Sequence, residues 1–249
     1  MNLKQVIRKY ILKSKVQSTT VGTLNEITRV NWLEETLKKI PKGSTILDAG
    51  AGEQQFKKFC AHLEYVSQDF AQYIPDNTNA GLQMEIWNYG KLDIISDIAS
   101  IPVENGSFDA IMCTEVFEHI INPIEAITEF SRILKKEGYL VLTAPFCSLT
   151  HFAPYHFYSG FNSFFYETEL DKNGFEIIEL KPNGNYFEYL AQEINRLPSI
   201  AKKHSKKILD KSETDSIRQL KILLQNLSDN DSNSSELLCF GFHILARKK

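Results

Sequence analysis

The chain has 249 residues, of which 43% are hydrophobic and 24% charged, and its formal net charge is −3. This balance excludes a disordered chain, and the lack of a basic excess argues against a nucleic-acid-binding surface, which must neutralise phosphates. No apolar run approaches the roughly 18 residues of a membrane-spanning helix. We therefore expect a cytoplasmic chain without stable membrane insertion, forming one large α/β domain or a core domain with an appendage.

The four cysteines stand singly inside apolar runs, with no paired spacing. They are Cys60, Cys113, Cys147 and Cys239. Such spacing indicates neither a disulfide framework nor a zinc site, so we expect reduced core cysteines and no metal ligands.

Two helices are predicted before the first strand. Residues Leu3 to Leu12 place apolar side chains at helical spacing opposite lysine and arginine, which predicts an amphipathic helix that packs on the domain or on a dimer partner. A membrane-surface role is the alternative for this basic helix. Leu24 to Ile40 forms the second helix, which Pro41 and Gly43 end.

A strand followed by a glycine turn comes next. Thr45 to Leu47 is a short apolar run that predicts a strand buried on both faces, and Asp48 closes it. Gly50 and Gly52 then mark a tight turn, after which Phe56 to Cys60 begins a helix. This layout is typical of a nucleotide cradle, because glycine lets the backbone approach a ligand closely. A turn whose glycines serve geometry alone is the alternative.

Three further strands follow, and the first two of them end in an acid. Glu64 to Asp69 is the second strand, and Asp69 follows Asp48 by 21 positions. An acid about 20 residues on is where a carboxylate takes the hydroxyls of a ribose. Leu92 to Asp97 is predicted as the third strand and Ser107 to Thr114 as the fourth. Residues 71–90 show no clean period and indicate a substrate-facing segment.

The second half of the chain continues the alternation of helix and strand. A helix starts at Asn122 and Pro123, a favourable cap and first position, and ends at Leu134. The remaining predicted elements are a strand from Gly138 to Thr143, a helix from Tyr166 to Asn173, a strand from Phe175 to Leu180, two helices at about 186–200 and 213–227, and a strand from Leu237 to Ala246.

Residues Ser148 to Phe165 are dense in aromatic and histidine side chains. These are His151, Phe152, Tyr155, His156, Phe157, Tyr158, Phe161, Phe164 and Phe165. The density exceeds what a core helix needs, so we interpret the segment as an acceptor pocket with stacking faces, with plain core as the alternative. Glu118 is most simply a solvated or helix-capping charge.

Several motifs together carry a family resemblance. They are Ile46-Leu-Asp-Ala-Gly-Ala-Gly52, Gln68-Asp-Phe70, Ser96-Asp-Ile98, Ile101-Pro-Val-Glu-Asn-Gly-Ser-Phe-Asp-Ala-Ile111, Glu115-Val-Phe-Glu-His119 and Leu134-Lys-Lys-Glu-Gly138. In this order they resemble the class I S-adenosylmethionine-dependent methyltransferases, in particular the type 11 group that acts on small molecules. The resemblance covers about Lys42 to Leu180 and the last strand.

The resemblance implies an α/β fold, a Rossmann-like seven-stranded methyltransferase sheet whose last strand is antiparallel. Within a single domain 1–249, we expect N-terminal helices over 1–41, a core over 42–182 and 236–249, and a helical insertion over 183–235. We expect this insertion to act as a lid or as a homodimer element.

The resemblance also implies a cofactor, S-adenosyl-L-methionine, which becomes S-adenosyl-L-homocysteine, over the carboxyl ends of the strands. Asp48 and the glycine-turn backbone would hold its methionine part, Asp69 its ribose and Asp97 its adenine amino group. The full set of expected cofactor-binding residues is Asp48, Ala49, Gly50, Gly52, Gln54, Asp69, Phe70, Asp97, Ile98, Thr114 and Glu115. Gln54 departs from the family, which often has a third glycine there, and this leaves the loop conformation open.

The expected chemistry is methyl transfer to a small-molecule acceptor. A hydroxyl acceptor would need a general base, for which His151, His156 and His119 are the candidates, although His119 lies at a position that often serves packing. We expect a hydroxyl of a glycan or sugar-linked compound. A quinone or other lipophilic acceptor and a catalytically silent cofactor-binding module are the alternatives.

Overall fold

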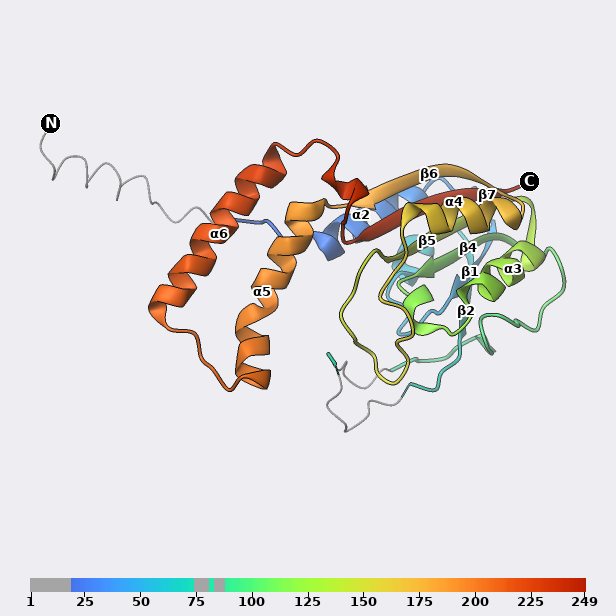
Figure 1. Ribbon diagram of the computed structural model, residues 1–249. Helices are drawn as coiled ribbons and strands as arrows, with labels where there is room; N and C mark the ends of the chain where they lie inside the picture. The colour runs from blue at the N-terminus through green and yellow to red at the C-terminus, as the bar shows by residue number, and fades with distance from the viewer. Residues whose placement is uncertain (1–18, 74–80, 83–87) are drawn as a thin grey trace, which may run out of the picture. The chain divides into compact units, whose positions relative to one another are not determined.

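The computed structural model describes residues 19–73, 81–82 and 88–249 (Figure 1). The helix expected at Leu3 to Leu12 lies outside these residues, as does much of the segment 71–90.

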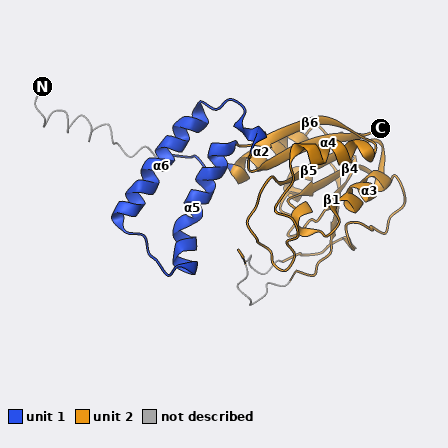
Figure 2. Cartoon of the chain, in the orientation of Figure 1, with its two compact units in different colours: residues 1–24, 185–237 blue, residues 25–184, 238–249 orange. Residues whose placement is uncertain are grey.

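Contacts within the chain divide it into two compact units (Figure 2). Unit 1 comprises residues 1–24 and 185–237, and unit 2 comprises residues 25–184 and 238–249. Unit 2 therefore contains the glycine turn, all the strand-end acids and the aromatic segment.

Unit 2 is built on a seven-stranded sheet in the order β3-β2-β1-β4-β5-β7-β6. The strands are β1 (Thr45–Ala49), β2 (Glu64–Asp69), β3 (Ile94–Ile95), β4 (Phe108–Thr114), β5 (Leu134–Pro145), β6 (Phe175–Asn183) and β7 (Gly241–Lys248). The first five are parallel, and β7 runs antiparallel to both β5 and β6. The predicted seven-stranded sheet with an antiparallel last strand is confirmed.

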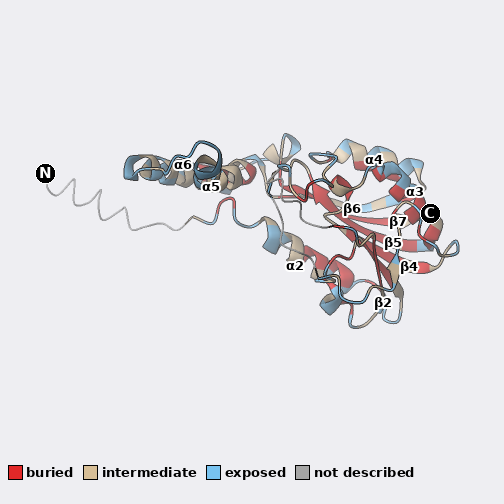
Figure 3. Ribbon diagram, turned by 90° about the horizontal axis from the view of Figure 1, so that it is seen from below, coloured by how far each residue is buried: buried red, intermediate tan, exposed pale blue. Residues whose placement is uncertain are grey.

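Alternation along the central strands fills two apolar layers. In β1, Leu47 packs in one buried cluster with α3 (Pro123–Ile133) and α4 (Ser163–Lys172), whereas Ile46 packs in the other with α2 (Asn25–Leu37). Successive side chains of a strand point to opposite faces, so helices cover both faces of the sheet and its centre is buried (Figure 3). A parallel sheet covered in this way offers its strand ends to a ligand.

Several expected elements differ from their predicted bounds. The helix predicted at Leu24 to Ile40 spans Asn25–Leu37, and the last strand begins at Gly241 instead of Leu237. The helix expected at Phe56 to Cys60 is a single 3₁₀ turn, η1 (Lys57–Cys60), because the Gly43 N–H donates to the His62 carbonyl and ties the chain back beside the start of β1. The third strand spans only Ile94–Ile95 rather than Leu92 to Asp97, although the Asp93 N–H still donates to the Ser67 carbonyl and the Ser96 N–H to the Asp69 carbonyl. The Asp93 carboxylate also accepts from the Ser67 N–H and hydroxyl.

The described part of unit 1 contains α5 (Tyr186–His204), α6 (Lys211–Asp229) and the 3₁₀ turn η3 (Ser234–Glu236). Its buried apolar cluster is small, with Val21, Ala191 and Leu224 at its centre. Gly22 must be glycine: its φ is +76°, and a Cβ there would lie 2.3 Å from the Gln192 nitrogen. Both helices predicted in the insertion are present.

Candidate functional site

The glycine turn after β1 is held against the end of β2. The N–H groups of Gly50 and Ala51 both donate to the Gln68 carbonyl, at 2.9 and 2.8 Å. Gly50 has a φ of +78°, and a Cβ there would lie 2.5 Å from a methyl group of Val116. Only glycine combines this backbone conformation with such close packing.

Asp69, the last residue of β2, bridges the same turn. Its Oδ2 accepts from the Gly52 N–H at 2.8 Å, and its Oδ1 accepts from the Ala71 N–H at 2.9 Å. Burial raises the pKa of this carboxyl, while the bonds from Ala71 and Gly52 act to lower it. The predicted ribose acid thus lies directly beside the glycine turn.

Asp48 is buried at the end of β1, with an exposed fraction of 3%. Its Oδ2 accepts a 2.6 Å bond from the Tyr65 hydroxyl of β2. Burial raises the pKa of Asp48 to about 7, against the lowering effect of the Tyr65 bond and together with the nearby charge of Asp69. A carboxylate kept in so dry a place is stabilised by any cation that binds next to it.

Gln54 shows how the chain manages without the family's third glycine. Its φ is 56°, in the left-handed region that glycine favours. Its side-chain Nε2 donates to the carbonyls of Tyr89 and Lys91, both at 3.0 Å. The residue therefore adopts the glycine-like conformation and also ties residues 89–91 to the turn.

The adenine-end candidates surround the end of β3. Asp97 is exposed, and its Oδ1 accepts from the Ala99 N–H at 2.9 Å, whereas Ile98 is buried. The Phe70 ring meets the Tyr155 ring edge-on at 5.0 Å between centroids. Tyr155 belongs to the aromatic segment, so this segment reaches the candidate cofactor residues.

The sulfonium-end candidates lie at the end of β4. Glu115 has a φ of 53°, and its carboxylate accepts from the Thr143 hydroxyl at 2.9 Å and pairs with Arg29 at 3.1 Å. The Thr114 hydroxyl is buried and finds no hydrogen-bond partner within the described part of the chain. Ala49 is fully buried as the last residue of β1, beside β4 in the sheet. The candidates from β1, β2 and β4 thus share the carboxyl edge of the sheet.

The structure brings the three candidate histidines together. Ring centroids are 4.7 Å apart for His119 and His151, 4.9 Å for His151 and His156, and 5.9 Å for His119 and His156. Burial, together with the charges of His151 and His156, lowers the pKa of His119 to about 3, while the pKa of His156 is lowered mainly by burial. A group with so low a pKa is a weak general base near neutral pH.

The expectation that Glu118 is a solvated or capping charge is wrong. Its side chain is buried, and its Oε1 lies 3.6 Å from His119 Nε2 and 3.9 Å from His151 Nε2. The main-chain carbonyl of Glu118 accepts from the N–H groups of Phe157 and Tyr158, so the aromatic segment folds over it. The motif Glu-Val-Phe-Glu-His marks this position in the sequence. It does not indicate that the aromatic segment covers the Glu118 side chain.

Arg29 and Tyr65 are polar contributors that the sequence did not single out. Arg29 reaches Glu115 from α2, across the packing of a helix on the sheet. Tyr65 reaches Asp48 from the neighbouring strand, where Asp48 lies opposite Ser67. The strand pairing could have suggested Tyr65, whereas nothing local marks Arg29.

The sequence model of a protein family described as a methyltransferase domain matches residues 30–180. The chain belongs to this family. It is a class I S-adenosylmethionine-dependent methyltransferase, with the mixed seven-stranded sheet described above. The family assignment expected from the motifs is confirmed, and it makes the chain an enzyme by family.

Curated relatives match part of this methyltransferase. The ubiquinone biosynthesis O-methyltransferase of Xanthomonas oryzae pv. oryzae is 29% identical over 104 residues, which are 41% of this chain and 43% of that protein. The match thus spans less than half the length of this curated relative.

Solved structures agree on the fold. A SAM-dependent methyltransferase from Archaeoglobus fulgidus matches with a TM-score of 0.54 and 15% identity, covering 96% of this chain and 99% of that one. A Haemonchus contortus phosphoethanolamine N-methyltransferase 2, in complex with S-adenosyl-L-methionine, matches with a TM-score of 0.53 and 17% identity over 89% of this chain and 52% of that one. At these identities the likeness shows the fold alone.

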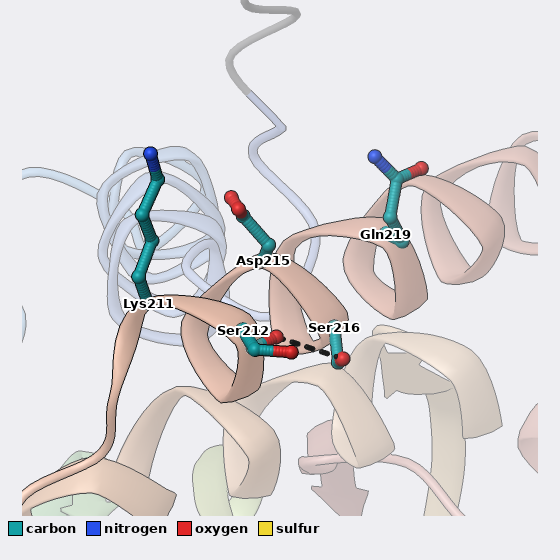
Figure 4. A pocket seen from close by; sticks show the side chains of 5 residues that line it. All are labelled: Lys211, Ser212, Asp215, Ser216 and Gln219. Atoms are coloured by element: carbon teal, nitrogen blue, oxygen red, sulfur yellow. Dashed lines mark hydrogen bonds between the residues drawn. The ribbon is translucent and has the colours of Figure 1, made fainter.

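Two further observations concern the described residues outside the candidate site. Within the described residues, no helix has the length and apolar character required to span a bilayer. In unit 1, a surface hollow on α6 is lined by Lys211, Ser212, Asp215, Ser216 and Gln219 (Figure 4). All five belong to one helix face, where Ser216 Oγ donates to the Ser212 carbonyl, so a ligand there would be touched from one side only. We assign it no role.

Proposed function

We propose that this methyltransferase transfers the methyl group of S-adenosylmethionine to a hydroxyl oxygen of a small acceptor, with a glycan or sugar-linked compound as the first acceptor class. One juxtaposition supports the proposal most. Asp69 accepts from the Gly52 N–H of the glycine turn, and Asp48 lies in β1 just before that turn. The group of Glu118, His119 and His151 follows β4, the strand next to β1.

The residues at the carboxyl edge fit the cofactor in chemical character. Asp69 is already fixed by Gly52 and Ala71, and a carboxylate has lone pairs left for two ribose hydroxyls. Asp48 offers a buried negative charge to the cationic methionine portion. Burial raises the pKa of Asp48 to about 7, and a cation bound beside it would favour the ionised carboxylate.

When bound, S-adenosylmethionine supplies an activated methyl group on a sulfonium leaving group. The protein residues must then hold the acceptor oxygen in line with it, and such alignment lowers barriers by several kcal/mol. We assign to this position Thr114, the last residue of β4, and Glu115, which follows it. Arg29 holds the Glu115 carboxylate in place through its 3.1 Å ion pair.

The aromatic segment is the proposed acceptor pocket. Phe157 and Tyr158 keep 44% and 37% of their surface exposed. Their backbone N–H groups donate to the Glu118 carbonyl and so anchor the segment. The Tyr158 hydroxyl donates to the Ile121 carbonyl at 2.8 Å, which fixes the ring. Fixed, partly exposed ring faces suit the stacking of a sugar or a planar ring.

A second candidate acceptor is a quinol or another lipophilic phenol. It is favoured by the match to a ubiquinone biosynthesis O-methyltransferase at 29% identity. Here too the acceptor atom would be a hydroxyl oxygen, and stacking faces would be needed as well. Co-sedimentation of the protein with liposomes would separate the two, because only a lipophilic acceptor favours docking on a membrane surface.

Calorimetric titration tests the cofactor part of the proposal. Wild type should bind S-adenosylmethionine, and Asp69→Ala should weaken binding tenfold or more, which is about 1.4 kcal/mol. Asp171→Ala is the matched control, because Asp171 is an exposed carboxylate on α4 that pairs only with Lys249 among its described contacts. Equal affinity in wild type and Asp69→Ala would contradict the proposed pocket.

An acceptor screen tests the second part. Purified protein is incubated with S-adenosylmethionine and separate panels of glycans, nucleotide sugars, phenols and quinols, and S-adenosylhomocysteine formation is measured. Mass spectrometry then locates the added methyl group. Methylation at nitrogen or carbon would refute the hydroxyl assignment, and a phenol-only response would decide for the second candidate.

A further inference from the structure

Three potential metal-ligand atoms meet after β4. They belong to the Glu118 carboxylate and the His119 and His151 imidazoles, and all lie within 4.8 Å of one another. Two of the side chains come from η2 (Phe117–His119) and one from the aromatic segment. The cluster is therefore a product of the tertiary fold and not of spacing in one helix.

The two imidazoles are oriented in the way that metal-bound histidines are. The Nδ1 of His119 lies 2.6 Å from the Tyr155 carbonyl, and the Nδ1 of His151 lies 2.8 Å from the Leu149 carbonyl. Since a carbonyl only accepts, each Nδ1 carries the proton and each Nε2 presents its lone pair. Both Nε2 atoms face Glu118 Oε1. Ligating histidines characteristically donate their other ring N–H to such a carbonyl.

The carboxyl group of Glu118 provides an independent observation. Its side chain is only 2% exposed, and Oε2 meets no hydrogen-bond donor in the part of the chain that the structure describes. Both distances to histidine Nε2, 3.6 and 3.9 Å, are too long for hydrogen bonds. A buried carboxyl oxygen without a donor is costly, and a cation bound between these groups would compensate it.

We propose that Glu118, His119 and His151 form a binding site for one divalent first-row transition-metal ion, of the Zn²⁺, Co²⁺ or Mn²⁺ class. Two histidines and a carboxylate are a known ligand set for catalytic Zn²⁺, which keeps a further position open. Ligands at about 2.1 Å from a tetrahedral ion lie about 3.4 Å apart. The two separations from Glu118 need to shorten by about 0.5 Å or less to reach this value.

The metal would act on the acceptor and thereby deepen the proposed function, on which this part of the inference rests. An acceptor hydroxyl bound at the open position loses its proton to solvent more easily. The oxygen lone pair then forms the O–C bond to the methyl group as the C–S bond breaks, and that electron pair stays on sulfur as the neutral thioether.

Metal titration of the full chain tests the site itself. Protein freed of metal is titrated with Co²⁺, followed by its visible absorption, and with Zn²⁺ against a chromogenic chelator, and bound metal is counted by mass spectrometry. We expect one ion per chain without thiolate charge-transfer bands. Glu118→Gln and His151→Ala should each weaken binding tenfold or more. His204→Ala is the control, because His204 is an exposed histidine at the end of α5.

The outcomes separate the two proposals. No saturable binding by wild type, unchanged affinity in both variants, or a thiolate band would overturn the metal site. His151→Ala leaves the buried Glu118 in place, and thermal melting followed by circular dichroism verifies that each variant is folded. S-adenosylmethionine binding is measured separately, so the cofactor proposal can fail while the metal site stands, and the reverse. Turnover unaffected by metal removal would refute the role in acceptor activation.

Discussion

Asp48 offers a test in which stability and ligand binding should change in opposite directions. Its carboxyl is buried and has a pKa raised to about 7, mainly by burial. Asp48→Asn keeps the shape and an oxygen that can accept from the Tyr65 hydroxyl, but it removes the charge. The substitution should therefore relieve a cost of the folded protein and abolish the favourable partner of a bound cation.

The magnitude follows from proton linkage. The folded chain keeps the Asp48 proton up to about pH 7, whereas the unfolded chain loses it near the ordinary pKa of 3.8. Between these pH values the folded state binds more protons, so the free energy of unfolding falls as pH rises. At about 1.4 kcal/mol per pH unit, this group removes up to about 4 kcal/mol of stability by pH 8. The asparagine does not titrate and escapes the loss.

Urea unfolding at pH 4.5 and pH 8 measures this difference. Between pH 4.5 and pH 8, Asp48→Asn should gain up to about 3 kcal/mol of unfolding free energy relative to wild type. Asp109→Asn is the control, because burial raises the pKa of Asp109 but the bonds from Lys135 and the Thr45 N–H outweigh it and hold the pKa below its ordinary value. This carboxyl titrates mainly below pH 4.5, so the stability of Asp109→Asn relative to wild type should hardly change between the two pH values. Titration with S-adenosylmethionine should show weakened binding by Asp48→Asn. No relative gain at pH 8 would refute the reasoning.

Three further predictions use other residues of the site. Gln54→Ala keeps the left-handed backbone but loses the bonds to residues 89 and 91, so amide exchange over 88–91 should accelerate. In urea unfolding, Gln54→Gly should recover part of the stability that Gln54→Ala loses. Arg29→Ala leaves the Glu115 carboxylate without its cation and should cost about 1–3 kcal/mol in unfolding free energy, whereas Arg218→Ala, in an exposed pair, should cost less than 1. His119 has a pKa lowered to about 3, so its contribution to stability is present above pH 6.5 and is lost as pH falls. Between pH 8 and pH 5, the melting temperature of His119→Asn should therefore drop less than that of wild type, and an equal drop would contradict the assigned pKa.

Local patterns were enough to predict the sheet. Apolar runs, glycine turns and strand-end acids recur with each βα unit, so β1, β2 and β4 and the acids Asp48 and Asp69 were placed correctly. Elements at the edge were less predictable. β3 has only two residues, and no periodicity in the sequence predicts bounds as short as these.

The interior of the site depends on contacts far apart in sequence. Glu118 was assigned to solvent because its neighbours along the chain say nothing about the loop that covers it through Phe157 and Tyr158. For the same reason the three histidines could be named as candidates, but their grouping could not be predicted. The roles assigned to all these residues, in cofactor binding and in catalysis, stay predictions.

The connection between β6 and β7 has an evolutionary consequence. These strands are antiparallel neighbours, with Asn183 opposite Gly241, and the Phe240 N–H donates to the Asn183 carbonyl at 2.9 Å. The chain could close this pair with a short hairpin, yet residues 185–237 are inserted at its tip. Because both ends of the insertion meet on paired strands, the helical segment can be lengthened, exchanged or lost without altering any strand register. Selection is thus free to remodel α5 and α6 while the catalytic sheet stays constant.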